Sequence, residues 1–451
     1  MAEHRAATSP GIYCPDNPLL EDVLVQSCGR GFRLDHARLF LHFICAKRWM
    51  HYIDEYEFAR LNAGILRWYI QPRALGALKR YLTDNGVLIT SPHSAGNYAT
   101  GYSIAPAFDG PPKRYEIQYA PLAQKIRDFR AACGLTQENP DLHAVVARRR
   151  PLLDHFRDSL DMLSLPDTPE AMVEDLADEV DPEHVAYVAQ CIKYCDHRGL
   201  TIDGFGWRVH HLITMTSSHL RPRLLLNGSQ VAEVDVANSQ PMLLSLLLQE
   251  AKRAQETTTP STPERRGGRE RDSSGGVPRP SIMLCIRSIC CAFEPFVRAV
   301  PSQEIQTFLC ACESGELYDL LAGDVGIDRQ QAKHELFRDV LFGRPNVHGP
   351  LTRAFSSHWP HVLEAIRQAK QQLGYKSISQ ALQRLESVIM LDDIAFRLMD
   401  EFPGVPFLTI HDSALLVAAS AEQVKALMLE EFGRWGINPT IRIKAPAVGS
   451  F

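Results

Sequence analysis

Two short segments of this 451-residue chain each place an aspartate among β-branched and apolar residues. Asp235 lies in Val-Ala-Glu-Val-Asp-Val-Ala-Asn-Ser-Gln (231–240), and Asp412 lies in Leu-Thr-Ile-His-Asp-Ser-Ala-Leu-Leu-Val (408–417). A carboxylate at the end of a buried strand is costly to desolvate unless a cation neutralises it. We therefore expect two strands to bring these aspartates together around a pair of metal ions. Such a pair is suited to transfer of a phosphoryl or nucleotidyl group.

A third segment places two cations and an aromatic ring at equal intervals. Arg329, Lys333 and Phe337 recur every four residues. In a helix, residues at i, i+4 and i+8 lie roughly on one face. The guanidinium fork and the ammonium group suit the triphosphate of a nucleotide, and the ring can stack on its base. This spacing predicts a nucleotide-binding helix face.

From about residue 208 to the C-terminus, the chain resembles the superfamily of family-A DNA polymerases and phage-type single-subunit RNA polymerases. In that superfamily an aspartate strand, a cationic helix and an aspartate hairpin follow one another in this order. The resemblance implies an α+β fold, a right-hand polymerase with an antiparallel palm sheet and helical fingers. It also implies that Asp235 and Asp412 hold two Mg²⁺ ions, which Mn²⁺ could replace, and that Lys333 takes part in catalysis.

The chain departs from the superfamily at three places. Gln240 stands where family-A polymerases have the glutamate that excludes the ribose 2′-hydroxyl. Ser413 follows Asp412, where DNA polymerases usually have glutamate and the phage RNA polymerases tolerate serine. The family expects Tyr-Gly eight and nine residues after the lysine, whereas here Gly343 comes one place late. The choice between deoxyribose and ribose is therefore open.

Further polar residues are candidates for contact with nucleic acid. Arg208 and the segment Arg221-Pro-Arg223 precede the aspartate strand. The others lie in the helix before the hairpin or directly beside Asp412. Structural ion pairs would explain several of them equally well. The candidates are Arg208, Arg221, Arg223, Gln383, Glu386 and His411.

Three regions are predicted along the chain. Residues 1–111 form an N-terminal helical and winged-helix-like domain, in which 1–57 is mainly helical and a helix ending at Asn85-Gly86 precedes strands at 87–90 and 102–105. The alternative for this domain is a small α+β unit without a ligand. Residues 112–205 form a helical thumb-like region or linker, and 206–451 form palm and fingers.

The C-terminal part has the clearest pattern of elements. We expect long helices at 359–373 and 377–399, a strand at 406–410, a turn at 411–413, a strand at 414–418, a helix at 421–435 and a strand at 440–444. Residues 252–281 are polar, rich in Gly, Pro, Ser and Thr, and without periodicity. This composition predicts a disordered insertion within the palm and fingers.

Composition limits the possible classes of protein. The net charge of −5 means that nucleic-acid binding needs a local basic groove. No stretch approaches the ~18 apolar residues of a membrane span, and the N-terminus lacks the apolar core of a signal peptide. Eleven cysteines without a repeating frame indicate a reducing, cytoplasmic setting. Packing explains Cys191 and Cys195 better than a zinc site with His197.

Together these features predict a nucleotidyltransferase that adds nucleotides to a nucleic-acid 3′ end by two-metal catalysis, most simply a DNA polymerase. Its partners are DNA or RNA and dNTP or NTP, with no membrane. No exonuclease or P-loop motif occurs upstream. One alternative is an RNA polymerase or primase on the same palm. The other is a catalytically degraded polymerase fold that acts as a replication initiator or nucleic-acid-binding scaffold.

Overall fold

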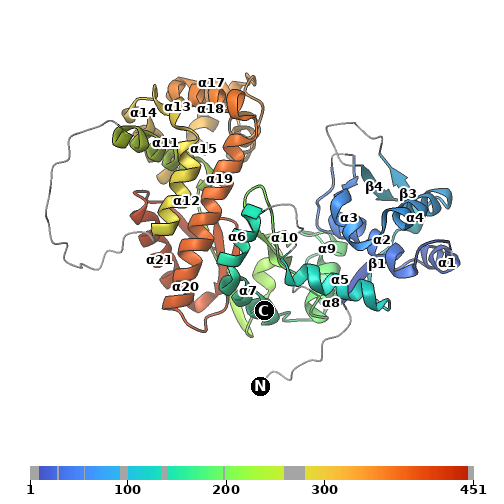
Figure 1. The fold of residues 1–451 in the computed structure, drawn as a ribbon. Helices are drawn as coiled ribbons and strands as arrows, with labels where there is room; N and C mark the ends of the chain where they lie inside the picture. Colours follow the sequence, from blue (N-terminus) through green and yellow to red (C-terminus); the bar gives the residue numbers. More distant parts are fainter. Residues whose placement is uncertain are drawn as a thin grey trace. The chain divides into compact units, whose positions relative to one another are not determined.

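The computed structural model describes residues 10–27, 30–54, 56–91, 100–133, 140–196, 199–258 and 280–444 (Figure 1). The chain divides into two compact units. Unit 1 comprises Met1–Gln137, Leu160–Thr201 and His210–Gln230, and unit 2 comprises Glu138–Ser159, Ile202–Val209 and Val231–Phe451. Both combine helices with small antiparallel sheets, so the fold class is α+β. The domain boundaries near 111 and 205 stay predictions.

Unit 1 holds short strands and mostly short helices. They are β1 (Gly11–Pro15), α1 (Pro18–Gln26), α2 (Leu34–Trp49), β2 (Ala59–Arg60), α3 (Ala63–Tyr69), α4 (Pro72–Asp84), β3 (Leu88–Thr90), β4 (Gly101–Ile104), η1 (Pro106–Phe108), β5 (Pro112–Glu116), α5 (Ala120–Ala131), β6 (Leu163–Ser164), α8 (Pro169–Asp175), α9 (Pro182–Lys193), α10 (Leu212–Met215), η2 (Arg221–Arg223) and β9 (Leu225–Leu226). Four elements run across the unit boundaries: α7 (Arg150–Asp161), β7 (Thr201–Ile202), β8 (Val209–His210) and β10 (Ser229–Val236).

One part of unit 1 differs from the prediction of helices. Segment 11–15 is a buried strand, β1, that pairs antiparallel with β5. The two strands lie about 100 residues apart in the chain, so neither short segment shows its partner locally. The predicted order of helix, strand and strand is present as α4, β3 and β4, in a sheet of order β2-β4-β3. A winged-helix role for this sheet stays a prediction.

Unit 2 is larger and more helical. Its elements are α6 (Pro140–Arg148), α11 (Ser239–Thr258), α12 (Pro280–Cys291), α13 (Glu294–Val297), α14 (Ser302–Glu313), α15 (Leu317–Val325), α16 (Arg329–Glu335), the π-helix η3 (Leu336–Leu341), α17 (Pro350–His358), α18 (Pro360–Leu373), α19 (Ser377–Ser387), the π-helix η4 (Val388–Ala395), α20 (Phe396–Glu401), β11 (Phe407–Ile410), β12 (Ser413–Val417), η5 (Ala418–Ser420), α21 (Ala421–Arg434) and β13 (Ile441–Lys444).

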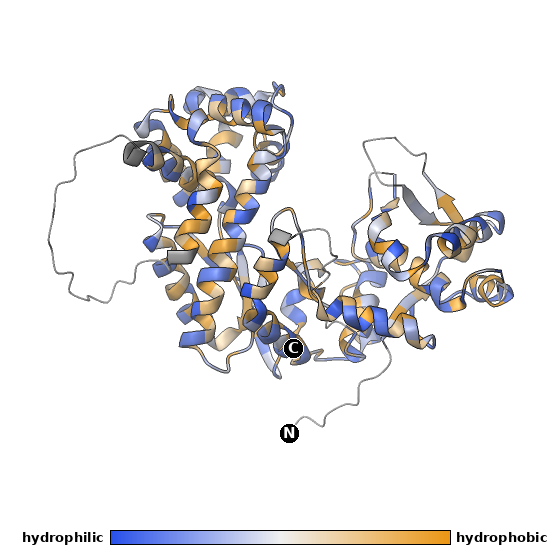
Figure 2. Cartoon of the chain, viewed as in Figure 1, coloured by the Kyte–Doolittle hydropathy of each residue, from blue (hydrophilic) through white to orange (hydrophobic). Residues whose placement is uncertain are grey.

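The sheet of unit 2 confirms the predicted C-terminal elements. β11 and β12 form a hairpin, β12 pairs with β10, and β13 pairs with β10, all antiparallel. The helices α19 and α20 are joined through η4 into one long rod (Figure 1). Hydrophobic and hydrophilic residues alternate along the helices, as Figure 2 shows. The alternation follows from each helix burying one face and exposing the other.

The predicted insertion is shorter at its N-terminal end than expected. Helix α11 continues to Thr258, so 252–258 is helical and the prediction of a loop there is wrong. These residues include Lys, Arg, Ala, Gln and Glu, which favour helix and let α11 extend. Residues 259–279 lie outside the described residues, and α12 begins at Pro280.

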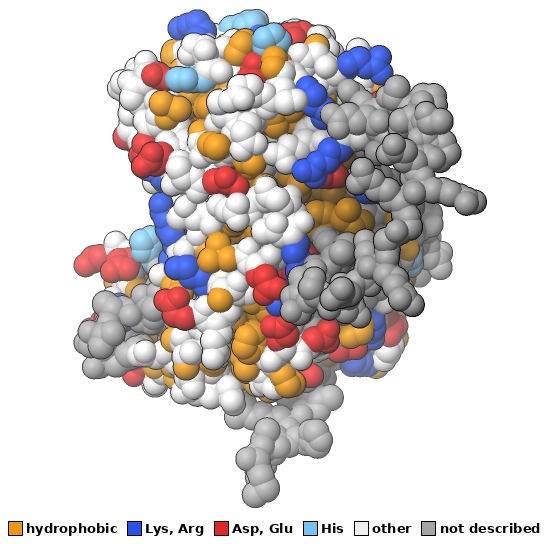
Figure 3. Space-filling view, turned by 90° about the vertical axis from the view of Figure 1, so that its left-hand side faces the viewer, with side chains coloured by type: hydrophobic (Ala, Val, Ile, Leu, Met, Phe, Trp, Pro, Cys, Tyr) orange, Lys and Arg blue, Asp and Glu red, His pale blue; other side chains and the backbone are white. Residues whose placement is uncertain are grey.

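The described surface carries both signs of charge. On the face drawn in Figure 3, the coloured acidic and basic side chains are interspersed among hydrophobic and other groups. None of the described helices is long and apolar enough to cross a membrane. Each cysteine within the described ranges is a free thiol, including Cys191 and Cys195, while His197 lies outside those ranges.

Candidate active site around two aspartates

The sheet of unit 2 brings Asp235 and Asp412 together. In the pairing of β10 with β12, Asp235 lies opposite Ser413, the residue directly after Asp412. The backbone N–H of Val236 donates to the Asp412 carbonyl at 3.3 Å. Asp235 and Asp412 are therefore neighbours at one end of β10, and the negative charge of Asp235 is close enough to contribute to the raised pKa of Asp412.

The turn between β11 and β12 sets the position of Asp412. His411, the first residue of that turn, has a φ of 57°, in the left-handed region. Histidine, asparagine and aspartate adopt this region more readily than most residues do. His411 thus permits the backbone shape of the turn that carries Asp412, and its predicted contact with nucleic acid stays a prediction.

Asp412 is a carboxylate without a dedicated cation. Burial raises the pKa of Asp412 to about 8, and the negative charges of Glu386 and Asp235 add to this effect, while Arg208 opposes it. No ion pair joins Asp412 to a basic side chain among the residues the structure describes. Its raised pKa marks a place where a positive charge would be stabilising.

Asp235 has a partner of its own on the neighbouring strand. Lys444 Nζ, from β13, lies 2.9 Å from Asp235 Oδ2 and 3.6 Å from Glu233 Oε1. Burial opposes the charge on Lys444, but the hydrogen bond with Asp235 and the nearby carboxylates outweigh it and raise the pKa of Lys444. The ammonium group remains half exposed, so it is free to shift its position. Sequence reasoning missed Lys444, because only the β10–β13 register reveals its proximity.

A buried polar set lies beside the aspartates. Glu386, from α19, is 2% exposed and accepts hydrogen bonds from Arg208 Nε at 2.8 Å, from Gln240 Nε2 and from Ser239 Oγ at 3.4 Å. Burial raises the pKa of Glu386, and the charge of Arg208 opposes this rise. Because Gln240 is itself buried and its amide nitrogen is engaged by Glu386, it is a fixed part of the wall of the site.

The loop between β7 and β8 packs closely on α19. A Cβ atom at Gly206 would lie 2.8 Å from Gln383 Cβ, which α19 holds in place, so a side chain there would force the loop to shift. The Arg384 guanidinium lies 4.3 Å from the centroid of the Trp207 ring and its Nε donates to the Phe205 carbonyl at 3.0 Å. Because of this packing, Arg208 reaches Glu386. The candidate residues Arg208 and Gln383 therefore both belong to the contact between this loop and α19.

The cationic helix is connected to the aspartates through a tyrosine that sequence reasoning missed. Tyr318, from α15, is buried, and the Arg329 Cζ and Lys333 Nζ atoms lie 5.4 and 6.0 Å from its ring centroid. Burial raises the pKa of Tyr318, and the charge of Asp412 adds to the rise. Lys333 is exposed. The cations of α16 and the carboxylate of Asp412 thus both act on Tyr318, although nothing in the spacing of 329–337 points to it.

Arg329 begins α16, and Phe337 lies beyond its end, in the adjoining π-helix η3. Arg329 Nε lies 3.0 Å from Asp319 Oδ2, and its Nη2 donates to the Gly315 carbonyl at 3.1 Å. Phe337 lies in η3, half-buried, with its ring centroid 5.1 Å from that of Phe342. The Phe342 N–H donates to the Phe337 carbonyl, an i+5 bond typical of a π-helix. The triad therefore continues from α16 into a widened turn.

The remaining two candidates belong to unit 1. Arg221 Nη1 donates to the Thr216 carbonyl at 3.1 Å, and Arg223 Nη1 lies 2.9 Å from Asp175 Oδ2. Both guanidinium groups thus have structural partners, as the alternative reading of these residues anticipated. The described parts of the chain contain no group of three or more His, Cys, Asp or Glu side chains arranged to hold a metal ion.

The comparisons with known proteins identify no family and give a weak structural similarity. No family model and no curated protein matches the chain. Among solved structures, the chain is similar to the POL domain of Pol1 from M. smegmatis in complex with DNA primer-template and dNTP. The match covers 71% of this chain and 72% of that one at 10% identity, with a TM-score of 0.27. A superposition at that score does not define a fold, so functional inference rests on the geometry of the site.

Proposed function

We propose that this chain is a metal-dependent nucleotidyltransferase of the family-A polymerase type, which adds deoxynucleotides to a nucleic-acid 3′ end. The observation that carries the proposal is the meeting of Asp235 and Asp412 at one end of β10, with Asp412 lacking a cation. A structural aspartate is normally neutralised or hydrogen-bonded where it is buried. A carboxyl group whose pKa is raised by burial and by a second carboxylate is typical of a functional site.

The two aspartates fit divalent metal ions. Both are hard oxygen donors, which Mg²⁺ and Mn²⁺ prefer, and the unpaired charge of Asp412 would be offset by a bound cation. Asp235 and Asp412 would hold the ions. When bound, the metal pair would lower the pKa of the 3′-hydroxyl and stabilise the charge on the leaving pyrophosphate. The half-exposed Lys444 would release Asp235 as positive charge arrives.

The cations of α16 would bind the triphosphate. Lys333 is exposed, and Arg329 pairs with Asp319 at a surface position where such a pair contributes little. A phosphate could therefore replace Asp319 at small cost and gain a charge-assisted contact. Tyr318, buried under both cations, would fix their positions relative to Asp412. Phe337, half-buried at the widened turn, would support the base.

The one-residue delay of Gly343 has a physical explanation in η3. A π-helical turn closes its hydrogen bonds at i+5, so it accommodates one residue more than an α-helical turn. Phe342 follows this turn and is the ninth residue after Lys333. It would then occupy the place in space of the tyrosine that the family has eight residues after its lysine. This reading favours an intact finger helix over a degraded one.

Two features bear on the product. Ser413 is buried, and its Oγ lies within hydrogen-bond distance of two acceptors, the Ile410 carbonyl at 3.1 Å and Glu233 Oε1 at 3.2 Å, so its hydroxyl is engaged within the sheet. Gln240 Nε2 donates to Glu386, so the Gln240 amide would be a rigid wall for a sugar. Both points favour a DNA product. An RNA polymerase or primase remains the second candidate, because Gln240 replaces the charged gate residue.

Primer extension tests the proposal. The full-length chain is incubated with a labelled primer, with and without template, with dNTP or NTP, and with Mg²⁺ or EDTA. Asp412→Asn should abolish extension. Asp393→Asn is the matched control, because Asp393 is also a buried acid with a raised pKa but lies outside the site. No extension by the wild type under any of these conditions, or equal activity of Asp412→Asn, would overturn the proposal.

A further inference from the structure

Unit 1 contains a cavity of about 690 Å³ that plays no part in the proposed chemistry. Its volume falls in the range of small-molecule sites. The lining comes from the residues before and at the start of α2, from the end of α3, and from the starts of α4 and α5. The lining residues used below are Arg33, His36, Tyr69, Gln71, Tyr119 and Lys125.

Three helices begin at this cavity. The N-cap residues of α2, α4 and α5 are Arg33, Gln71 and Tyr119, all three of which line it. None of the three makes a side-chain hydrogen bond to cap its helix. Helix N-termini carry unpaired N–H groups and a partial positive charge. These helix starts give the cavity a partial positive charge, but α4 and α5 each have a proline in the first turn that removes one N–H donor.

The charged side chains of the cavity have the same sign. Arg33 and Lys125 line it, and no acidic residue does. The nearest acid in sequence, Asp35, turns its carboxylate to the backbone N–H groups of Gln118 and Tyr119, at 2.8 and 2.6 Å. His36 Nδ1 is buried and has no hydrogen-bond partner among the described residues. The cavity thus offers two cations and an unused ring nitrogen, and the neighbouring carboxylate of Asp35 is engaged by backbone N–H groups.

Flat rings complete the lining. The Arg33 guanidinium lies 4.1 Å from the centroid of the Tyr119 ring, and His36 meets the same ring edge-on at 5.7 Å. Tyr69, at the end of α3, is buried and also lines the cavity. Aromatic side chains and stacked guanidinium planes are the surfaces on which nucleobases stack.

We propose that this cavity binds a nucleotide, with its phosphates at the three helix N-termini, Arg33 and Lys125, and its base against Tyr119. The proposal is independent of the active site in unit 2. The nucleotide is either a free nucleoside triphosphate or one residue of a single strand, and both present the same base and phosphate chemistry.

Calorimetric titration of the full-length chain tests the proposal. EDTA is present and Lys333 is replaced by alanine, so that the proposed active site contributes little binding. ATP should bind at least tenfold more tightly than either inorganic tripolyphosphate or adenosine, since each lacks one half of the ligand. A short 5′-phosphorylated oligonucleotide forms the second arm. Tighter binding of ATP identifies a free nucleotide, and tighter binding of the oligonucleotide identifies a strand residue.

Substitutions locate the binding. Arg33→Ala and Lys125→Gln should each weaken ATP binding by about tenfold, because each removes a charge-assisted contact. Arg127→Gln is the matched control, as Arg127 is an exposed basic residue of α5 outside the lining. Lys125 Nζ also donates to the Trp68 carbonyl at 3.0 Å, so the exposed Arg33 gives the variant least able to disturb folding.

A spectroscopic signature accompanies binding. Burial, Arg33 and Lys125 lower the pKa of His36, and a bound phosphate would offset the two cations and raise it. An NMR titration of the His36 ring should show this rise with ATP and not with adenosine. Failure of ATP to bind, equal affinity for tripolyphosphate, or binding unchanged in Arg33→Ala and Lys125→Gln would each overturn the proposal, while leaving the primer-extension test of unit 2 untouched.

Discussion

Replacing Asp412 with asparagine should stabilise the metal-free protein while abolishing its activity. In the folded chain the pKa of Asp412 is raised to about 8, whereas in an unfolded chain an aspartate titrates near ~3.9. Between these values the folded state binds a proton that the unfolded state has lost. The free energy of unfolding therefore falls as pH rises through this window.

The size of the effect follows from the pKa displacement. Each unit corresponds to about 1.4 kcal/mol, so the full displacement would be about 6 kcal/mol. Asp412 is only partly buried, so solvent screens its charge. Its pKa also depends on the protonation of Glu386 and Asp235, and both effects make the free-energy difference smaller than this upper value. We expect roughly 2–3 kcal/mol at pH 8 and almost nothing at pH 4.

Urea unfolding of wild type and Asp412→Asn at several pH values, in EDTA, measures this difference. The advantage of the variant should grow from pH 4 to pH 8. Excess Mg²⁺ should then stabilise the wild type at pH 8 and leave the variant nearly unchanged, because metal binding to the folded state adds to its stability. A constant difference across pH, or an equal response of both proteins to Mg²⁺, would refute the assignment of Asp412 as an uncompensated metal ligand.

Three further predictions concern residues around this centre. Lys333→Ala should lower kcat/KM for dNTP and NTP alike by about tenfold to a hundredfold, as loss of a contact to the shared phosphates requires, whereas Arg338→Ala in the adjoining π-helix should change it little. Gln240→Glu should place two buried carboxylates in contact at Glu386 and destabilise the chain by roughly 2 kcal/mol or more, seen as a lower Tm that recovers toward acidic pH; an unchanged Tm would show that Gln240 does not contact Glu386. Asp393→Asn should raise the Tm above pH 6 and not below pH 4, because burial and the nearby Glu431 raise the pKa of Asp393 to about 6; a pH-independent change in Tm would contradict this.

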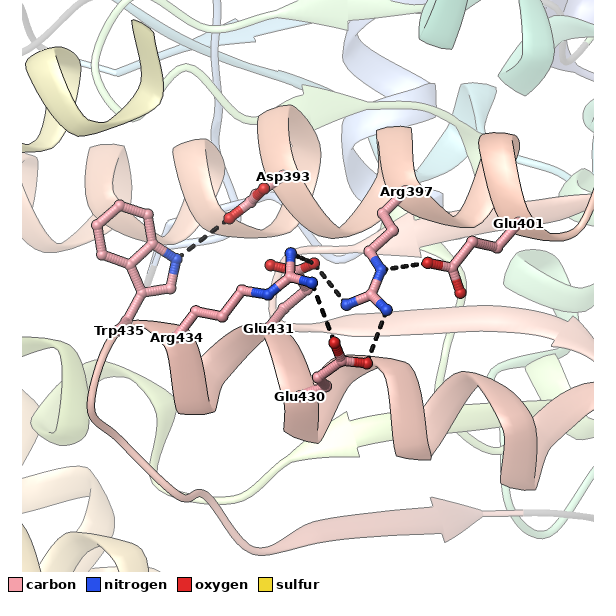
Figure 4. Close-up of polar contacts among 7 residues, drawn as sticks. All are labelled: Asp393, Arg397, Glu401, Glu430, Glu431, Arg434 and Trp435. Carbon is pink, nitrogen blue, oxygen red and sulfur yellow. Dashed lines mark hydrogen bonds and ion pairs between the residues drawn. The ribbon is translucent and has the colours of Figure 1, made fainter. Parts of the chain in front are cut away.

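The environment of Asp393 explains why such a residue is tolerated (Figure 4). Its carboxylate accepts a hydrogen bond from Trp435 Nε1 at 3.2 Å. The neighbouring Glu431, fully buried, is held by Arg397 and Arg434, each at 2.7 Å. The two guanidinium groups neutralise Glu431, while Asp393, which interacts with Glu431, has no ion pair of its own among the described residues. An asparagine oxygen at 393 can accept the same hydrogen bond.

Local sequence patterns predicted the C-terminal part of the fold well. The hairpin around Asp412, the helix α21 and the strand β13 were predicted to within a few residues. Alternating or helical periodicity and a turn at each boundary mark these elements, and such signals are local. The same locality explains the failure at β1, whose identity as a strand depends on the distant β5.

The polar residues around the aspartates were harder to predict. Glu386 and Arg208 read equally well as surface ion pairs, since a single sequence does not reveal that the pair is buried. Tyr318 and Lys444 become relevant only through tertiary contacts, in one case a ring beneath two cations and in the other a cross-strand neighbour. The spacing of residues along one helix or strand shows which of them share a face of that element. It does not show which other element packs against that face.

The π-helices η3 and η4 make two long helices tolerant of changes in length. One residue added to a regular α-helix rotates everything beyond it by about 100° and shifts it by about 1.5 Å. A π-helical turn absorbs that residue locally. In the α19–α20 rod, Glu386 precedes η4, while Arg397 follows it. A residue inserted or lost near Arg397 would therefore leave the position of Glu386 unchanged, as long as η4 absorbs the change.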